Sequence, residues 1–81
     1  MIELQRLREV FRTALDLPED SPVDDLHYQD DDKWDSLAHM SLVAALEDEF
    51  SVMIDTDDVI GMSSFAEAMR ILGKYGVDFN E

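Results

Sequence analysis

The chain has 81 residues, of which 20 are Asp or Glu and 6 are Lys or Arg, so that its net charge is −14 at pH 7. A chain of this length buries only about 60% of the surface that it exposes when unfolded, so we expect residues 1–81 to form one small domain without a separate catalytic unit. The charge argues against nucleic acid and anionic membranes as partners and indicates basic protein surfaces, although many acidic domains use such charge only for solubility.

Two absences narrow the class of protein further. The sequence contains no cysteine, so a disulfide framework and a thiolate metal site are both excluded. Residues 1–12 alternate charged with apolar residues, unlike a secretory signal, and no apolar run reaches the length of a membrane span. We therefore expect a cytoplasmic protein that does not insert into membranes.

The first predicted element is an amphipathic helix from about Ile2 to Asp16, which Pro18 is expected to end. The stretch 17–35 that follows is loop-like and longer than most connections in compact domains. Within it we predict one short helical turn over residues 22–26. The residues expected to hold this loop against the core are Val23, Leu26 and Tyr28.

The second predicted helix runs from Ser36 or Leu37 to Phe50. Its buried side carries Leu42, Val43, Leu46 and Phe50, and His39 falls on the same side at 100° per residue. The opposite side, called the outer face below, carries Leu37, Met40, Ala44, Glu47 and Asp48. Either its apolar residues are incidental, or they bind partners while the carboxylates steer basic surfaces toward them.

Two shorter elements complete the prediction. Residues 55–58, which are Asp55, Thr56, Asp57 and Asp58, begin a short helix that Gly61 closes. Ser64 with Glu67 forms a capping box for a last helix that stops at Gly73. No strand pattern is present, so the expected fold is all-α, a small four-helix bundle with a long first loop and a short third helix. Residues 1–2 and 74–81 are expected to be loosely ordered.

Catalysis and metal binding are both poorly supported. Ser36 and His39 lie three residues apart on one helix, but no third group orients the histidine, so we expect no enzyme activity. Residues 30–32 are all Asp, but the spacing that follows lacks the glycine and glutamate of a calcium loop, so no metal site is expected.

Ser36 therefore has two interpretations. It stands where an acidic loop becomes a helix, and Ser36 or Asp35 could act simply as the N-cap. The free backbone amides and the positive end of the helix dipole would equally favour a phosphate group attached to the serine hydroxyl.

The sequence Asp35, Ser36, Leu37 before an amphipathic helix that continues through 42–50, followed by Ile54, resembles the acyl carrier proteins over nearly the whole chain to Leu72. The resemblance implies that a phosphopantetheinyl transferase attaches 4′-phosphopantetheine from coenzyme A to Ser36. The thiol of that arm would hold acyl groups as thioesters and deliver them to acyl-loading and acyl-processing enzymes. The implied recognition residues are Asp35, Leu37, Met40, Ala44, Glu47 and Asp48, on a protein that is a monomer and catalyses nothing itself.

Departures from the family pattern point to a dedicated carrier of a specialised lipid, polyketide or secondary-metabolite pathway. Ala38 and Ser41 stand where carriers of housekeeping fatty acid synthesis usually have acidic residues, and Trp34 replaces a small residue. An acyl pocket between the helices would be bordered by His39, Met40, Leu46 and Ile54, with the histidine favouring a short or polar cargo. The alternative is an unmodified acidic helical adaptor or inhibitor that binds a basic protein.

Overall fold

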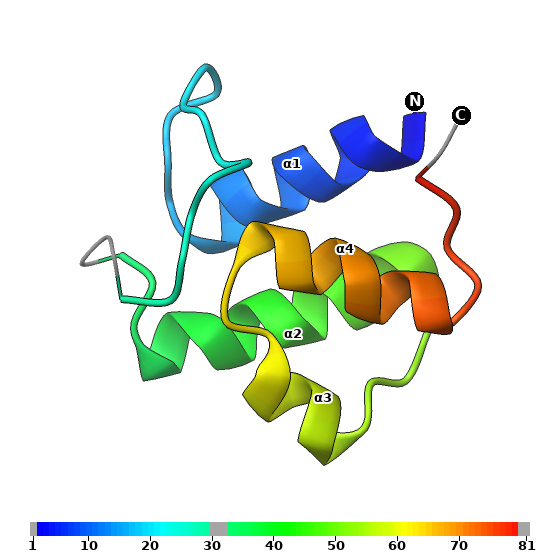
Figure 1. Ribbon diagram of the computed structural model, residues 1–81. Coiled ribbons are helices and arrows are strands. Elements are labelled where there is room, and N and C mark those ends of the chain that lie inside the picture. Colours follow the sequence, from blue (N-terminus) through cyan, green and yellow to red (C-terminus); the bar gives the residue numbers. More distant parts are fainter. Residues whose placement is uncertain (1, 30–32, 80–81) are drawn as a thin grey trace.

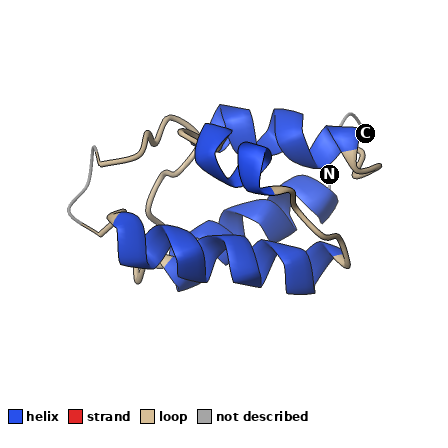
Figure 2. Cartoon of the chain, turned by 90° about the horizontal axis from the view of Figure 1, so that it is seen from below, coloured by secondary structure: helices blue, strands red, loops and turns tan. Residues whose placement is uncertain are grey.

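The computed structural model describes residues 2–29 and 33–79, and within them the chain forms four helices. These are α1 (Ile2–Ala14), α2 (Ser36–Phe50), α3 (Thr56–Gly61) and α4 (Phe65–Lys74). Figure 1 shows α3 below α2 and α4, on the side away from α1, and Figure 2 shows helices joined by extended loops. The predicted all-α fold with a short third helix is confirmed.

Three aromatic side chains form the centre of the core. The ring of Phe11 meets the Trp34 ring edge-on at a centroid distance of 5.4 Å and the Phe65 ring at 4.9 Å. Trp34 is fully buried although it belongs to the loop. Because edge-to-face aromatic pairs add to the free energy of burial, Trp34 fixes the end of the loop two residues before Ser36.

The long first loop is held at a second place by backbone hydrogen bonds. Tyr28 N–H donates to the carbonyl of Ser63 at 2.8 Å, and Phe65 N–H donates to the carbonyl of Leu26 at 3.0 Å. Val23 is buried, and Leu26 and Tyr28 pack against the core, as the sequence predicts. These bonds join the loop to the connection between α3 and α4.

Two boundaries in this region differ from the prediction. The helix α1 ends at Ala14, because Asp16 adopts a left-handed φ of 56° and Leu17 N–H donates back to the carbonyl of Arg12 at 2.7 Å. Pro18 lies beyond this closure. The segment 22–26 forms only a hydrogen-bonded turn, in which Leu26 N–H donates to the Val23 carbonyl at 3.0 Å, instead of a helical turn.

The capping box of α4 is only half formed. The hydroxyl of Ser64 accepts a hydrogen bond of 3.0 Å from Glu67 N–H, as predicted, but the Glu67 carboxylate pairs with Arg70 at 2.7 Å. The helix also continues past Gly73, and Gly76, with a φ of 98°, is the glycine that takes the left-handed conformation.

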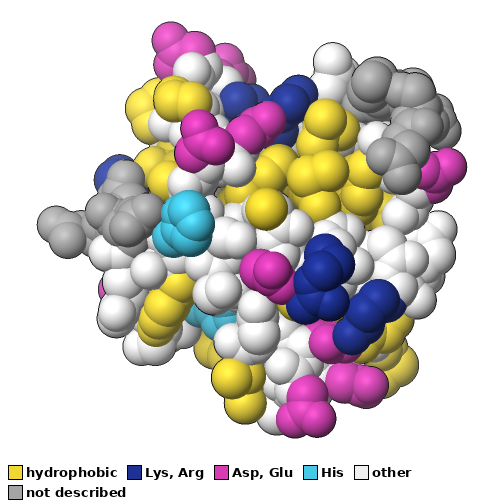
Figure 3. Space-filling model, in the orientation of Figure 1, with side chains coloured by type: hydrophobic (Ala, Val, Ile, Leu, Met, Phe, Trp, Pro, Cys, Tyr) yellow, Lys and Arg dark blue, Asp and Glu magenta, His cyan; other side chains and the backbone are white. Residues whose placement is uncertain are grey.

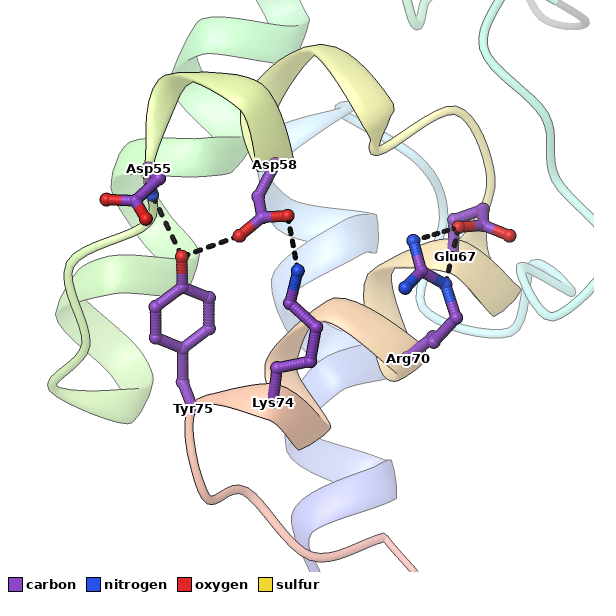
Figure 4. A network of polar contacts seen from close by, with 6 residues as sticks. All are labelled: Asp55, Asp58, Glu67, Arg70, Lys74 and Tyr75. Atoms are coloured by element: carbon purple, nitrogen blue, oxygen red, sulfur yellow. Dashed lines mark hydrogen bonds and ion pairs between the residues drawn. The ribbon is translucent and has the colours of Figure 1, made fainter.

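In the segment after α4, Tyr75, Val77 and Phe79 pack in or against the core, whereas the sequence predicted a loosely ordered tail over 74–81. Residues 1 and 80–81 of the predicted loose ends lie outside the described residues. Phe79 is 9% exposed, and its ring lies 6.1 Å from the ring of Phe50. The Tyr75 hydroxyl donates to Asp58 at 2.7 Å, and Lys74 bonds to the same carboxylate at 2.7 Å (Figure 4). These contacts fix the end of α4 against α3.

Basic side chains in the structure lie beside acidic ones (Figure 3). Arg6 pairs with Glu49 at 2.7 Å and joins α1 to the end of α2, while Arg8 pairs with Asp24 at 2.8 Å and joins α1 to the loop. Within the described part of the chain, no helix has the length and apolar character needed to cross a membrane.

Candidate functional site at the start of the second helix

Asp35 is the N-cap of α2. Its backbone is extended, and its carboxylate accepts a hydrogen bond of 2.9 Å from the N–H of Ala38. Its carbonyl accepts the first helical bond, from His39 N–H at 2.8 Å. From the sequence, either Asp35 or Ser36 could have been the N-cap. The structure shows that Asp35 is the N-cap.

Ser36 occupies the first position of the helix, and its side chain is exposed. Its hydroxyl forms no hydrogen bond with any of the residues that the structure describes. The first amides of a helix lack intrahelical partners and carry a partial positive charge, and no acidic side chain lies in the first turn of α2. A phosphate on this hydroxyl would therefore lie in a favourable electrostatic position.

His39 links α2 to the first loop through one ring nitrogen and to α3 through the other. Trp34 Nε1 lies 3.0 Å from His39 Nδ1, and His39 Nε2 lies 2.8 Å from the carbonyl oxygen of Val59. An indole N–H can only donate, so Nδ1 accepts and Nε2 carries the proton that is donated to Val59. Both nitrogens are thus occupied, and His39 is not positioned to deprotonate Ser36.

A groove of about 310 Å³ opens next to Ser36, between the start of α2, α3 and the first loop. Its lining residues are Tyr28, Ser36, His39, Met40, Val59, Ile60, Met62 and Ser63. Of the four residues expected around an acyl pocket, His39 and Met40 line this groove. Leu46 and Ile54 do not line it, and both are buried in the core, with 0% and 8% exposure.

The outer face of α2 is exposed at most of its positions. Leu37 is 79% exposed and Met40 is 58% exposed, and Ala44 and Asp48 are exposed as well. Glu47 differs, because its half-buried carboxylate accepts a hydrogen bond of 2.8 Å from Ile54 N–H. Its backbone carbonyl also accepts from Val52 N–H at 3.1 Å, so Glu47 closes the end of α2.

Sequence reasoning missed the wall of the groove opposite α2. Ile60 is 75% exposed on α3 and lines the groove together with Met40. Its only sequence signal is an apolar residue in a helix too short to show a period. In the part of the chain that the structure describes, no group of three or more His, Cys, Asp or Glu residues could hold a metal ion. The Asp residues at 30–32 lie outside that part.

With this geometry in hand, comparison with known proteins identifies the family. The family described as "Phosphopantetheine attachment site" matches residues 5–72 of the chain. The chain belongs to the acyl carrier proteins. As a member, it is a carrier and not a catalyst, and its cofactor is a covalently attached 4′-phosphopantetheine, as the resemblance implied.

Named relatives agree with this assignment. This carrier is 32% identical over 71 residues to an acyl carrier protein of Kineococcus radiotolerans, an alignment that covers 88% of each chain. It is 36% identical over 69 residues to an acyl carrier protein of Beutenbergia cavernae, covering 85% of this chain and 84% of the relative. No solved structure matches the carrier at a significant level.

Proposed function

We propose that Ser36 is the residue to which 4′-phosphopantetheine is attached. The observation that carries the proposal is that Asp35 caps α2, while the exposed Ser36 hydroxyl has no hydrogen bond to any described residue. A phosphopantetheinyl transferase would use coenzyme A as the donor. The serine oxygen forms a bond to phosphorus, the bond to the adenosine bisphosphate breaks, and the serine proton passes to a base of the transferase.

The thiol at the end of the arm holds an acyl group as a thioester and delivers it to acyl-loading and acyl-processing enzymes. These partners dock on Asp35 and the outer face of α2, where Leu37 and Met40 supply apolar contact and the carboxylates attract basic surfaces. Tethering raises the effective concentration of the acyl group at each partner, so that docking stays weak and reversible. A monomer in the cytoplasm suits this role, because the outer face has to remain accessible.

The pathway is a specialised one, of lipid, polyketide or another secondary metabolite. The first turn of α2 contains no acidic residue, and Ala38 and Ser41 occupy the places where housekeeping carriers usually have them. Ser41 is exposed. A partner that recognises acidic residues at these two places would therefore bind this carrier weakly.

Intact mass measurement tests the attachment. The carrier is incubated with coenzyme A, magnesium and a broad-specificity phosphopantetheinyl transferase, beside the Ser36→Ala and Ser41→Ala variants. We expect the parent and Ser41→Ala to gain one phosphopantetheine and Ser36→Ala to gain none. A gain by Ser36→Ala, or no gain by the parent with several transferases, would contradict the proposal.

A reconstituted bacterial fatty acid synthase tests the pathway. We expect it to elongate acyl groups on the loaded carrier slowly, and faster on a carrier with Ala38→Glu and Ser41→Glu. Efficient elongation on the parent, with no gain in the double variant, would place the carrier in housekeeping fatty acid synthesis.

A further inference from the structure

The groove beside Ser36 is small. Its volume of about 310 Å³ stands at the lower limit of small-molecule sites, which are typically about 300–1,000 Å³. Ser36 lies at its mouth, Met40 and Ile60 form an apolar rim, and the buried side chain of Met62 lines it. Such a groove has room for a small group carried on the arm.

The core lies beyond this groove along the buried side of α2. Leu42 and Leu46 follow His39 at three and seven residues, on the same side of the helix, and neither is exposed. Neither residue lines the groove, whereas His39 does. A long acyl chain that ran from Ser36 along the buried side of α2 to Leu42 and Leu46 would have to pass the His39 side chain.

Contacts on several sides hold that side chain in place. His39 Nε2 is bonded to the Val59 carbonyl of α3 at 2.8 Å, and Nδ1 is bonded to the buried Trp34 at 3.0 Å. The imidazole lies at 22° to the plane of the Trp34 ring, with centroids 6.1 Å apart, and meets the ring of Tyr28 edge-on at 5.4 Å. Separating α2 from α3 here would break the bond to Val59 and leave its partly buried carbonyl with the longer bond of 3.4 Å from Met62 N–H.

We infer that the hydrogen-bonded chain from Trp34 through His39 to Val59 closes the inner end of the groove and restricts the carrier to short acyl groups. His39 thereby determines which cargo the carrier shelters. The inference rests on the proposed function, because it takes Ser36 as the origin of the arm. It adds a class of cargo and the residue that selects it.

Thioester protection across a series of acyl groups tests the inference. The transferase loads the carrier from acetyl-, butyryl-, hexanoyl-, octanoyl- and dodecanoyl-coenzyme A, and hydrolysis of each thioester is compared with that of the free acyl pantetheine at mildly alkaline pH. For the parent we expect protection to increase up to butyryl or hexanoyl and to rise no further with longer chains. Dodecanoyl as the best protected group would overturn the inference.

Two substitutions of His39 test whether its hydrogen bonds, and not only its size, limit the length of the acyl group. His39→Leu removes both hydrogen bonds, and we expect it to slow hydrolysis of the octanoyl and dodecanoyl thioesters at least about threefold relative to the parent. His39→Gln keeps one acceptor and one donor on a planar group and is expected to retain the parent profile. A folded His39→Leu variant with the parent profile would overturn the inference.

The outcomes also distinguish this inference from the proposed attachment. If no acyl phosphopantetheine is attached to Ser36, the proposed function and the inference fail together. If loading succeeds and protection rises through dodecanoyl, only the chain-length restriction fails. The profile of the parent decides this point even if His39→Leu does not fold.

Discussion

The carboxylate of Asp35 accepts a 2.9 Å hydrogen bond from the backbone N–H of Ala38. Asp35 therefore caps α2, and the neighbouring Ser36 hydroxyl is available for attachment of the arm. Because Asp35 caps the helix, Ser36 is not needed for its stability. We expect Asp35→Ala to lower the free energy of unfolding by about 0.5–2 kcal/mol, the usual cost of losing an N-cap.

The matched variant is Ser36→Ala, which removes an exposed hydroxyl that has no bonding partner among the described residues. We expect it to change the free energy of unfolding of the unmodified carrier by less than about 0.5 kcal/mol. Urea denaturation followed by circular dichroism measures both variants. Equal destabilisation by the two would show that Ser36 shares the capping role.

The proposed docking surface makes a prediction about rates. Leu37 and Met40 are exposed on the outer face close to Ser36, whereas Met53, with 85% exposure, follows the far end of α2. We expect Leu37→Ala and Met40→Ala each to lower kcat/KM for the phosphopantetheinyl transferase by about tenfold, which corresponds to ~1.4 kcal/mol.

Met53→Ala is the control, because it removes a methionine that is even more exposed than Met40 but lies away from the modification site. We expect its kcat/KM to equal that of the parent. A loss as large as that of Met40→Ala would mean that exposed apolar residues contribute without regard to their place. In that case the outer face would not be the docking surface.

The carboxylate of Asp58 is expected to make the stability of the folded domain depend on pH. Hydrogen bonds from the Lys74 ammonium and then the Tyr75 hydroxyl hold the pKa of Asp58 below its ordinary value of 3.8. Since the folded-state pKa is the lower one, the stabilisation is fully present above about pH 4 and is lost as the pH falls through the lowered pKa. We therefore expect Asp58→Asn to melt at a lower temperature than the parent at pH 7, with a difference that shrinks toward pH 3.

Thermal melts at a series of pH values measure this difference. Asp24→Asn is the comparison, because Arg8 lowers the pKa of Asp24 in the same way but the Asp24 side chain is 51% exposed. Solvent screening should make its effect smaller. A difference for Asp58→Asn that does not change with pH would show that its bonds act through packing instead of charge.

The last described residue, Phe79, is expected to contribute to the stability of the whole domain. Its ring packs on Phe50, and its side chain is almost completely buried. Phe79→Ala should lower the free energy of unfolding by about 1.5–3 kcal/mol, the range for burying one such side chain, whereas Phe79→Leu should lose less. Urea denaturation checks this, and an unchanged midpoint for Phe79→Ala would indicate a tail that does not hold the core together.

The helices could be predicted from the sequence because their signals are local. Apolar residues at three- and four-residue steps located α1, α2 and α4, and the Ser64 cap formed as its spacing predicts. The long loop was predicted as a loop, but the complete burial of Trp34 was not, because it depends on contact with Phe11 of a distant helix. The burial of Phe79 was missed for the same reason, since it depends on contact with Phe50.

For the site as well, local features could be predicted from the sequence and long-range contacts could not. The sequence located the start of α2 and its exposed apolar residues, which follow from helical period alone. It did not show whether Asp35 or Ser36 caps the helix, because both residue types serve at that position. Nor did it show that Glu47 is bonded to Ile54 N–H or that His39 is bonded to Val59, since both depend on how the chain returns after α2.

The most direct test of the central claim is to find the residue that carries the arm. The carrier is modified with coenzyme A and a transferase and digested, and the phosphopantetheine-bearing peptide is fragmented in a mass spectrometer. We predict that the added mass lies on Ser36 alone, although Ser41, Ser51, Ser63 and Ser64 lie elsewhere in the same chain. Phosphopantetheine on any other residue, or its absence from Ser36, would contradict the account.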